Sequence, residues 1–327
     1  MDNFPVAMAD GIREKWITGI NAISSVSAIG LAETLLTKAY MLENANPSIS
    51  LLFQIPRQDL DLPQSFALEA ARFSNATFES LLEAKPSTTN EKSLGWPLIR
   101  TYYAAFFAAH ALLRICGESV TFLTTQQTNK LNQVAQIYSG QASNFSNGIF
   151  HFKISNNSQK ILVTQLNRGG GSHEDFWKIF YKFLIEVEDI LAKKFASSPD
   201  AITAIKTSQS LRKSLSRENC SAGSWLSQSR NSINYRHEYG VWYPYKINRQ
   251  KASSIARTFD NWQLEVSDWE INISKPDFAE AHLSNSHAIA ALLTCSLKDL
   301  AKRNTSRGKS FVDKLPFALL RQRQPGW

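Results

Sequence analysis

The residues best suited to chemistry lie between Arg230 and His237. The pattern of residues 225–239 predicts a helix, and each helical residue turns the chain by about 100°. Because Arg230 and His237 are seven positions apart, they share nearly the same face, with Asn234 between them and Asn231 to one side. Arginine keeps its charge and offers a planar fork of donors, and histidine titrates near neutral pH. This set could bind a phosphate and move a proton.

The charge of the surrounding chain fits the same chemistry. Residues 204–251 carry two acidic side chains, Glu218 and Glu238, against nine basic ones: Lys206, Arg212, Lys213, Arg217, Arg230, Arg236, Lys246, Arg249 and Lys251. Such a basic region suits a polyanion, and it would equally serve as a solubilising surface. An Arg and a His on one helix face are also common without any function, so this alternative stays open on spacing alone.

The composition bounds the class of protein. The 327 residues allow one large domain or two small ones, and a hydrophobic content of 43% excludes a disordered chain. Residues 101–113, the longest apolar run, are too few to span a bilayer, and the N-terminus lacks a signal-peptide pattern. Three widely spaced cysteines, Cys116, Cys220 and Cys295, form no metal-ligand motif. We therefore expect a cytoplasmic protein with reduced thiols and without membrane association, cofactor or metal.

Hydrophobic periodicity predicts an all-α fold in the main. Apolar residues recur at helical spacing in segments 1–45, 63–83, 95–114, 173–195, 201–217, 252–270 and 276–303. Residues 148–165 alternate instead and contain a polar turn, which predicts a small β-hairpin inserted at about 145–167.

Two further stretches bear on function. Residues 95–114 are rich in alanine and aromatic residues and apolar nearly all round, which predicts a buried helix with Pro97 in its first turn. His110 of this helix is expected in a core or interface, with catalysis the weaker alternative. Residues 241–245, Val-Trp-Tyr-Pro-Tyr, interrupt the helical pattern after Gly240. Their rings either pack on the end of the bundle or stack on an unpaired base.

The Arg-Asn-x5-His pattern from Arg230 to His237 resembles the signature of the HEPN superfamily (higher eukaryotes and prokaryotes nucleotide-binding domains). That signature has an Arg, a polar residue and a His after four to six intervening residues; here six intervene. Residues 102–114, Tyr-Tyr-Ala-Ala-Phe-Phe-Ala-Ala-His-Ala-Leu-Leu-Arg, resemble an early core helix of HEPN bundles. The resemblance covers about residues 63–245, interrupted by the hairpin.

The resemblance implies a domain organisation and partners. Residues 61–250 would form a HEPN-like helical bundle, with an N-terminal helical extension at 1–60 and a C-terminal helical extension and basic tail at 251–327. Two copies of the motif helix would meet in a homodimer with one composite cleft. The implied partners are RNA and, for a toxin or antiphage defence effector, an antitoxin or defence-system protein.

Catalytic HEPN proteins are metal-independent endoribonucleases, so the resemblance also implies roles. Arg230 would hold the scissile phosphate, His237 would transfer a proton, and Asn231 would orient one of them. RNA supplies its own nucleophile, the 2′-hydroxyl, so acid–base and charge stabilisation suffice to form a 2′,3′-cyclic phosphate. We assign RNA contacts to Lys206, Arg212, Lys213, Arg217, Asn234 and Arg236. The alternative is a non-catalytic HEPN-like module that binds RNA, a nucleotide or a partner protein.

Overall fold

Helices form most of the protein. The computed structural model describes residues 4–38, 40–46, 50–57, 59–86, 92–140, 143–155, 159–166, 172–259, 262, 273, 275 and 277–324. The α-helices are α1 (Phe4–Arg13), α2 (Leu31–Thr37), α3 (Asp61–Leu82), α4 (Gly95–Ile115), α5 (Thr125–Ser139), α6 (Ser172–Lys194), α7 (Pro199–Leu215), α8 (Trp225–Arg236), α9 (Arg249–Arg257), α11 (Phe278–Lys302), α12 (Phe311–Lys314) and α13 (Pro316–Arg323). The strands are β1 (Leu42–Asn46), β2 (Ser50–Gln54), β3 (Glu118–Leu123), β4 (Gly148–Ile154) and β5 (Lys160–Gln165).

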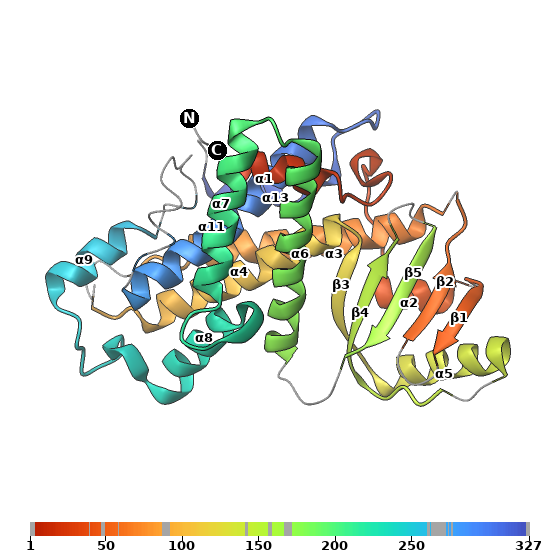
Figure 1. Cartoon of the computed structure of the whole chain (residues 1–327), viewed down its shortest axis with the longest axis horizontal. Helices are drawn as coiled ribbons and strands as arrows, with labels where there is room; N and C mark the ends of the chain where they lie inside the picture. Colours follow the sequence, from red (N-terminus) through yellow and green to blue (C-terminus); the bar gives the residue numbers. More distant parts are fainter. Residues whose placement is uncertain are drawn as a thin grey trace.

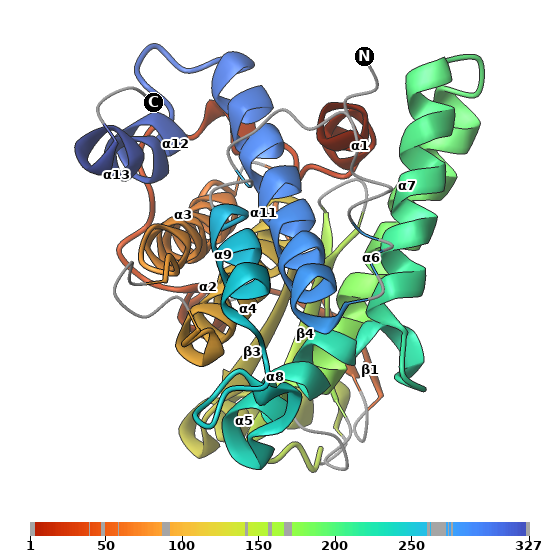
Figure 2. The same cartoon turned by 90° about the vertical axis from the view of Figure 1, so that its left-hand side faces the viewer.

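Most of the helices lie towards one end of the molecule and the sheet lies at the other, with α2 and α5 beside the sheet (Figure 1). Figure 1 shows the sheet at one end, with α3 and α4 running side by side away from it and α6 crossing them. In the view turned by 90°, α8 lies at the foot of the helical part (Figure 2). The mainly helical fold expected from periodicity is confirmed, and a sheet larger than expected accompanies it.

The sheet has the strand order β1-β2-β5-β4-β3 among the described residues, with every pairing antiparallel. The predicted hairpin is present as β4 and β5, where Phe152 faces Val163 and both side chains are buried. Its turn residues 156–158 lie outside the described residues. The hairpin is not a separate insertion, because β2 pairs with β5 and β3 pairs with β4. Residues 1–60 are likewise not purely helical, since they supply β1 and β2.

The alanine-rich helix α4 lies in the middle of the helical part. Five of its alanines have no exposed surface: Ala104, Ala105, Ala108, Ala109 and Ala111. Small side chains let neighbouring backbones approach closely, and α4 packs against α3, α11 and α8. The prediction of a buried helix at 95–114 is confirmed.

One hydrophobic core joins the middle of the chain to both terminal segments. It includes Phe4 and Met8 of α1 and Leu320 of α13 together with the residues of α3, α4 and α6. Helix α11, which lies in the range expected as a C-terminal extension, packs along α4 (Figure 2). Residues on both sides of position 60 contribute to this core, and those on both sides of position 250, among them Val241 and Ile255, contribute to a second, smaller cluster.

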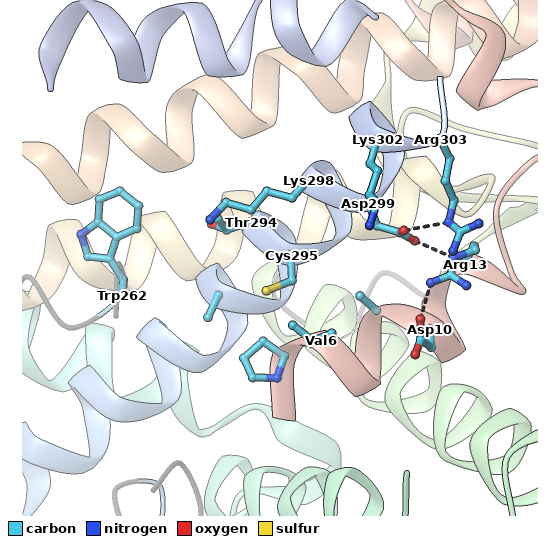
Figure 3. A pocket seen from close by; sticks show the side chains of 13 residues that line it. Val6, Asp10, Arg13, Trp262, Thr294, Cys295, Lys298, Asp299, Lys302 and Arg303 are labelled. Carbon is cyan, nitrogen blue, oxygen red and sulfur yellow. Dashed lines mark hydrogen bonds and ion pairs between the residues drawn. The ribbon is translucent and has the colours of Figure 1, made fainter. Parts of the chain in front are cut away.

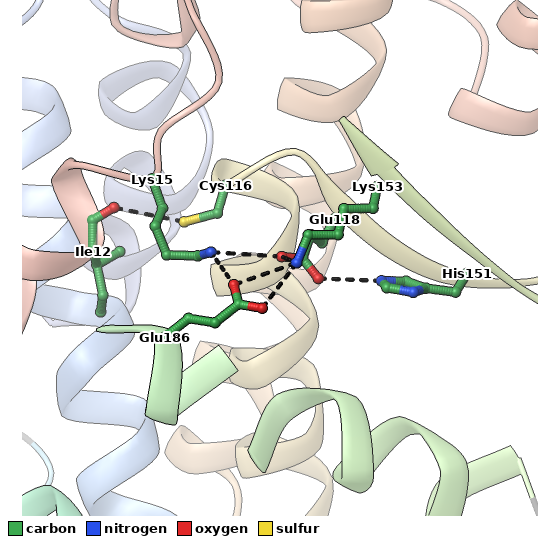
Figure 4. A network of polar contacts seen from close by, with 7 residues as sticks. All are labelled: Ile12, Lys15, Cys116, Glu118, His151, Lys153 and Glu186. Carbon is green, nitrogen blue, oxygen red and sulfur yellow. Dashed lines mark hydrogen bonds and ion pairs between the residues drawn. The ribbon is translucent and has the colours of Figure 1, made fainter. Parts of the chain in front are cut away.

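A network of charges connects the sheet to the helices (Figure 4). Glu118 of β3 is 4% exposed, and it accepts from Lys153 Nζ at 3.1 Å and pairs with His151 Nε2 at 3.1 Å. Lys153 Nζ also binds Glu186 of α6 at 2.9 Å, and Lys15 donates to the same carboxylate. Burial alone would raise the pKa of Glu118, but the His151 hydrogen bond and the lysine charges lower it to about 2. The ionised Glu118 carboxylate binds Lys153, and Lys153 in turn binds Glu186 of α6. These ion pairs therefore attach α6 to the sheet.

Two histidines are buried within the helical part. His110 stacks on Phe176 with ring centroids 3.7 Å apart, and its Nδ1 accepts a hydrogen bond from Arg114 Nη1 at 2.9 Å. Burial and the Arg114 charge hold the pKa of His110 well below its usual value. His282 of α11 donates from Nε2 to the Leu98 carbonyl at 3.0 Å, and burial lowers its pKa to about 4. Both rings are neutral in the folded protein near neutral pH.

These histidines predict a loss of stability in mild acid. The unfolded chain takes up protons below about pH 6.5 whereas the folded rings stay neutral, so the free energy of unfolding falls from pH 6.5 towards pH 4. The shift of the His282 pKa corresponds to a loss of roughly 3 kcal/mol in the free energy of unfolding when the pH falls from neutral to below 4. Urea unfolding at intervals between pH 7 and 4.5 should show this slope, and His282→Asn should make it shallower. An unchanged slope in the variant would contradict the assignment.

Candidate functional site

Helix α8, which carries Arg230, is shorter than its sequence pattern predicts. It ends at Arg236, and His237 takes a left-handed conformation (φ 53°, ψ 33°) with its N–H donating to the Ser232 carbonyl. Tyr239 is also left-handed at φ 65°, so the chain turns away instead of continuing as a helix to residue 239. Non-glycine residues rarely adopt this conformation, and periodicity therefore gives no sign of it. His237 lies exposed at the end of α8.

Arg230 packs inside its own chain. Its side chain is 7% exposed, and its guanidinium lies 5.4 Å from the Tyr102 ring centroid and 5.7 Å from that of Tyr103. Nη1 donates to Asn231 Oδ1 at 2.7 Å, and Asn231 is itself exposed. Nε is buried without a partner among the described residues. The cation is thus stabilised by two aromatic faces and keeps an unused donor.

A histidine that the motif does not include lies beside this arginine. His173, in the first turn of α6, shares a 2.8 Å hydrogen bond between its Nδ1 and the Tyr102 hydroxyl. Burial and the charge of Arg230 lower the pKa of His173 to about 4, and burial raises the pKa of Tyr102 to about 12. Trp177 Nε1 donates to the Tyr102 oxygen at 3.4 Å.

The structure brings together only part of the predicted catalytic set. Arg230 and Asn231 are in contact, whereas no hydrogen bond or ring contact links Arg230 to His237 within the described residues. The His237 ring instead lies 5.9 Å from the Trp242 ring, centroid to centroid. Asn234 is half-buried on α8.

The five basic residues predicted to bind RNA divide into two groups. Arg212 binds both carboxylate oxygens of Glu188 at 2.8 Å, and Arg217 donates to the Lys275 carbonyl at 3.0 Å. Arg212 connects α7 to α6. Arg217, which lies just after α7, connects this part of the chain to residue 275. The other group is exposed and reaches solvent: Lys206, Lys213 and Arg236.

The ion pair between Arg212 and Glu188 predicts that Arg212 stabilises the fold, although its place among basic residues suggests RNA binding. Replacing Arg212 by Ala leaves Glu188, whose side chain is 7% exposed, without its cation and lowers the free energy of unfolding by about 2 kcal/mol. Lys213→Ala, one position along α7 and exposed, is the matched control, with a change below about 0.5 kcal/mol. Urea denaturation measures both, and equal effects would rule out the structural role.

A separate pocket of about 340 Å³ lies between α1 and α11 (Figure 3). On one side, Asp299 binds Arg13 Nε at 2.6 Å and Arg303 Nε at 2.8 Å, and Asp10 also pairs with Arg13. The rest of the wall combines apolar and basic groups, among them Val6, Trp262, Cys295, Lys298 and Lys302. The ion pairs hold α1 against α11, and none of the residues predicted from the motif lines this pocket.

Comparison of the chain with protein-family models, with curated proteins and with solved structures finds no match. Among the residues that the structure describes, no group of three or more His, Cys, Asp or Glu side chains is placed to hold a metal ion. No helix in the described ranges is long and apolar enough to cross a membrane. The candidate site is therefore described only by the contacts of Arg230 with Asn231, Tyr102 and Tyr103.

Sequence reasoning missed Tyr102, Tyr103 and His173 as neighbours of Arg230. The two tyrosines belong to the aromatic helix, whose composition indicates burial without naming a partner. His173 follows a glycine run at 169–171 that lies outside the described residues. No local spacing relates these positions to residue 230, because they meet only when α4, α6 and α8 pack together.

Proposed function

We propose that this protein is a HEPN-like, metal-independent endoribonuclease. The observation that carries the proposal is the placement of Arg230 in contact with Asn231 and beside the neutral pair of Tyr102 and His173, on the helix that ends in an exposed His237. This arrangement offers a fixed cation, uncharged donors and one accessible imidazole at the end of a basic segment. Phosphate binding and proton transfer need these groups.

Each residue has a role in the proposed reaction. The 2′-hydroxyl oxygen attacks the adjacent phosphorus, His237 takes the hydroxyl proton, and the bond from phosphorus to the 5′-oxygen breaks. The departing 5′-oxygen takes a proton from solvent water, which gives a 2′,3′-cyclic phosphate and a 5′-hydroxyl, and His237 returns the proton it took to solvent. Arg230 and Asn231 stabilise the charge on the phosphoryl oxygens. A pKa of about 4 makes the His173 imidazole a weaker base than an ordinary histidine, so the proposal gives the role of base to His237.

The second candidate is a non-catalytic HEPN-like module that binds RNA, a nucleotide or a protein. The burial of Arg230 against Tyr102 and Tyr103 favours it, because a guanidinium that is 7% exposed has little surface for a substrate. The burial of Arg230 also limits which part of α8 a second copy could contact in the predicted dimer. A second copy would meet the exposed end of α8, at Tyr235 and His237, and not Arg230.

The proposal predicts RNA cleavage in the presence of EDTA that depends on the motif. His237→Ala should lower the cleavage rate by about 10²–10⁴-fold and leave RNA affinity nearly unchanged, since general acid–base help is of this size. Arg230→Lys should fail nearly as badly, because an ammonium cannot replace the planar fork. Gel analysis of a labelled RNA pool, with end-group assay for the cyclic phosphate, measures both effects.

The controls separate catalysis from folding. Gln250→Ala, an exposed change on α9, should cleave like the parent protein. Thermal unfolding shows whether Arg230→Lys still folds. Because His237 is exposed, His237→Ala tests the mechanism without removing a buried side chain. RNA with 2′-hydrogens should bind and stay intact. Cleavage that stops in EDTA, or that persists in His237→Ala, would contradict the mechanism and leave the non-catalytic module.

A further inference from the structure

Four aromatic residues, two exposed and two half-buried, lie near the end of α8, where Trp242 contacts His237 and Ile233. Tyr243 is 84% exposed and Trp96, at the start of α4, is 59% exposed. The Trp96 and Trp242 rings meet edge to face at 5.6 Å, and Tyr243 meets Tyr245 in the same way at 5.9 Å. We call these four residues the aromatic platform. Large rings are seldom this exposed in groups on a protein that has no partner for them.

The platform is held in a fixed position. Trp242 Nε1 donates to the Ile233 carbonyl of α8 at 2.8 Å, and Val241 beside it has no exposed surface. Gly95 lies so close to the Trp242 indole that an added Cβ would come within 2.4 Å of a ring atom. The Lys246 N–H donates to the Gly240 carbonyl at 3.1 Å and closes the turn. The exposure of Tyr243 thus belongs to an ordered surface.

The surroundings of the platform are cationic. Arg236, Lys246, Arg249 and Lys251 are all exposed along the chain on either side of residues 241–245, and Lys251 pairs with Asp277. Glu238 is the acidic residue nearest in sequence, and Arg236 lies 3.9 Å from it. Flat rings beside spread positive charge complement a chain that carries bases and phosphates. A purely apolar partner surface would offer no negative groups to pair with these basic side chains.

We propose that the aromatic platform binds unpaired bases of single-stranded RNA by stacking, with the phosphates along Arg236 and Lys246. The bases of a duplex are stacked inside the helix, so its surface offers no free base face to Tyr243 or Trp96. The choice of RNA rests on the proposed function, because the His237 ring touches Trp242 and a nucleotide stacked there has its phosphate beside the proposed base. The platform thus makes unpaired segments the substrate.

The test is a binding measurement on RNA that cannot be cleaved. A labelled 2′-O-methyl RNA of twelve nucleotides, alone or annealed to its complement, is titrated with the full chain and followed by fluorescence anisotropy. The single strand should bind at least tenfold more tightly than the duplex. Tyr243→Ala and Trp96→Ala should each weaken single-strand binding about tenfold, within the range found for one stacked base.

Conservative and distant variants complete the design. Tyr243→Phe keeps the ring and should retain the parent affinity, while Tyr138→Ala, an exposed change on α5, should have no effect. Lys246→Ala should flatten the dependence of affinity on salt, which Tyr243→Ala should leave unchanged. Equal affinity for duplex, or no effect of Tyr243→Ala, would overturn the platform.

The outcomes also separate this inference from the proposed reaction. Binding with the predicted preference but no cleavage of ordinary RNA keeps the platform and rejects the ribonuclease. Cleavage that is unaffected by Tyr243→Ala and Trp96→Ala keeps the ribonuclease and rejects the platform. If Tyr243→Ala instead shifts the protein from dimer to monomer in sedimentation and leaves RNA affinity unchanged, the rings join two copies and the inference is wrong.

Discussion

The close packing of α4 is the contact on which the site and the platform both depend. Its buried alanines admit α3 and α11 at short range, so the helix can lie in the middle of the core. Its other faces then meet α8 and α6, where Tyr102 contacts Arg230 and His173. Its first residue, Gly95, receives the Trp242 indole. A larger side chain at an inner alanine position would move both functional regions together.

The environment of Arg230 shows how a buried cation is kept without an acidic partner. Two tyrosine faces lie against the guanidinium, and the Asn231 oxygen accepts one of its protons. Burial keeps Tyr102 neutral by raising its pKa, and burial together with the Arg230 charge keeps His173 neutral by lowering its pKa. Since no carboxylate is described in contact with Arg230, its positive charge is not cancelled locally. The lack of a described carboxylate partner distinguishes Arg230 from Arg212, which is bound to Glu188.

Local pattern predicted the long helices and the hairpin, because periods of 3.6 and 2 residues arise within each segment. It did not predict β1, β2 or β3, whose five or six residues are strands only through pairing with distant partners. For the site, spacing put Arg230 and His237 on one helix face, but it could not foresee the left-handed turn at His237, which ends α8 at Arg236. It also grouped Arg212 with free cations, since nothing near residue 212 indicates Glu188 on the preceding helix.

The strand order has a consequence for how the chain reaches this fold. Strand β5 lies between β2 and β4, so the early β1–β2 hairpin finds its neighbour only after the chain up to residue 165 has been made. A two-stranded hairpin is marginally stable in water, and contacts distant in sequence form slowly. During synthesis the edge of β2, with Leu51 and Phe53, therefore stays open to other chains. We expect aggregation of nascent protein through this edge whenever translation pauses before β5.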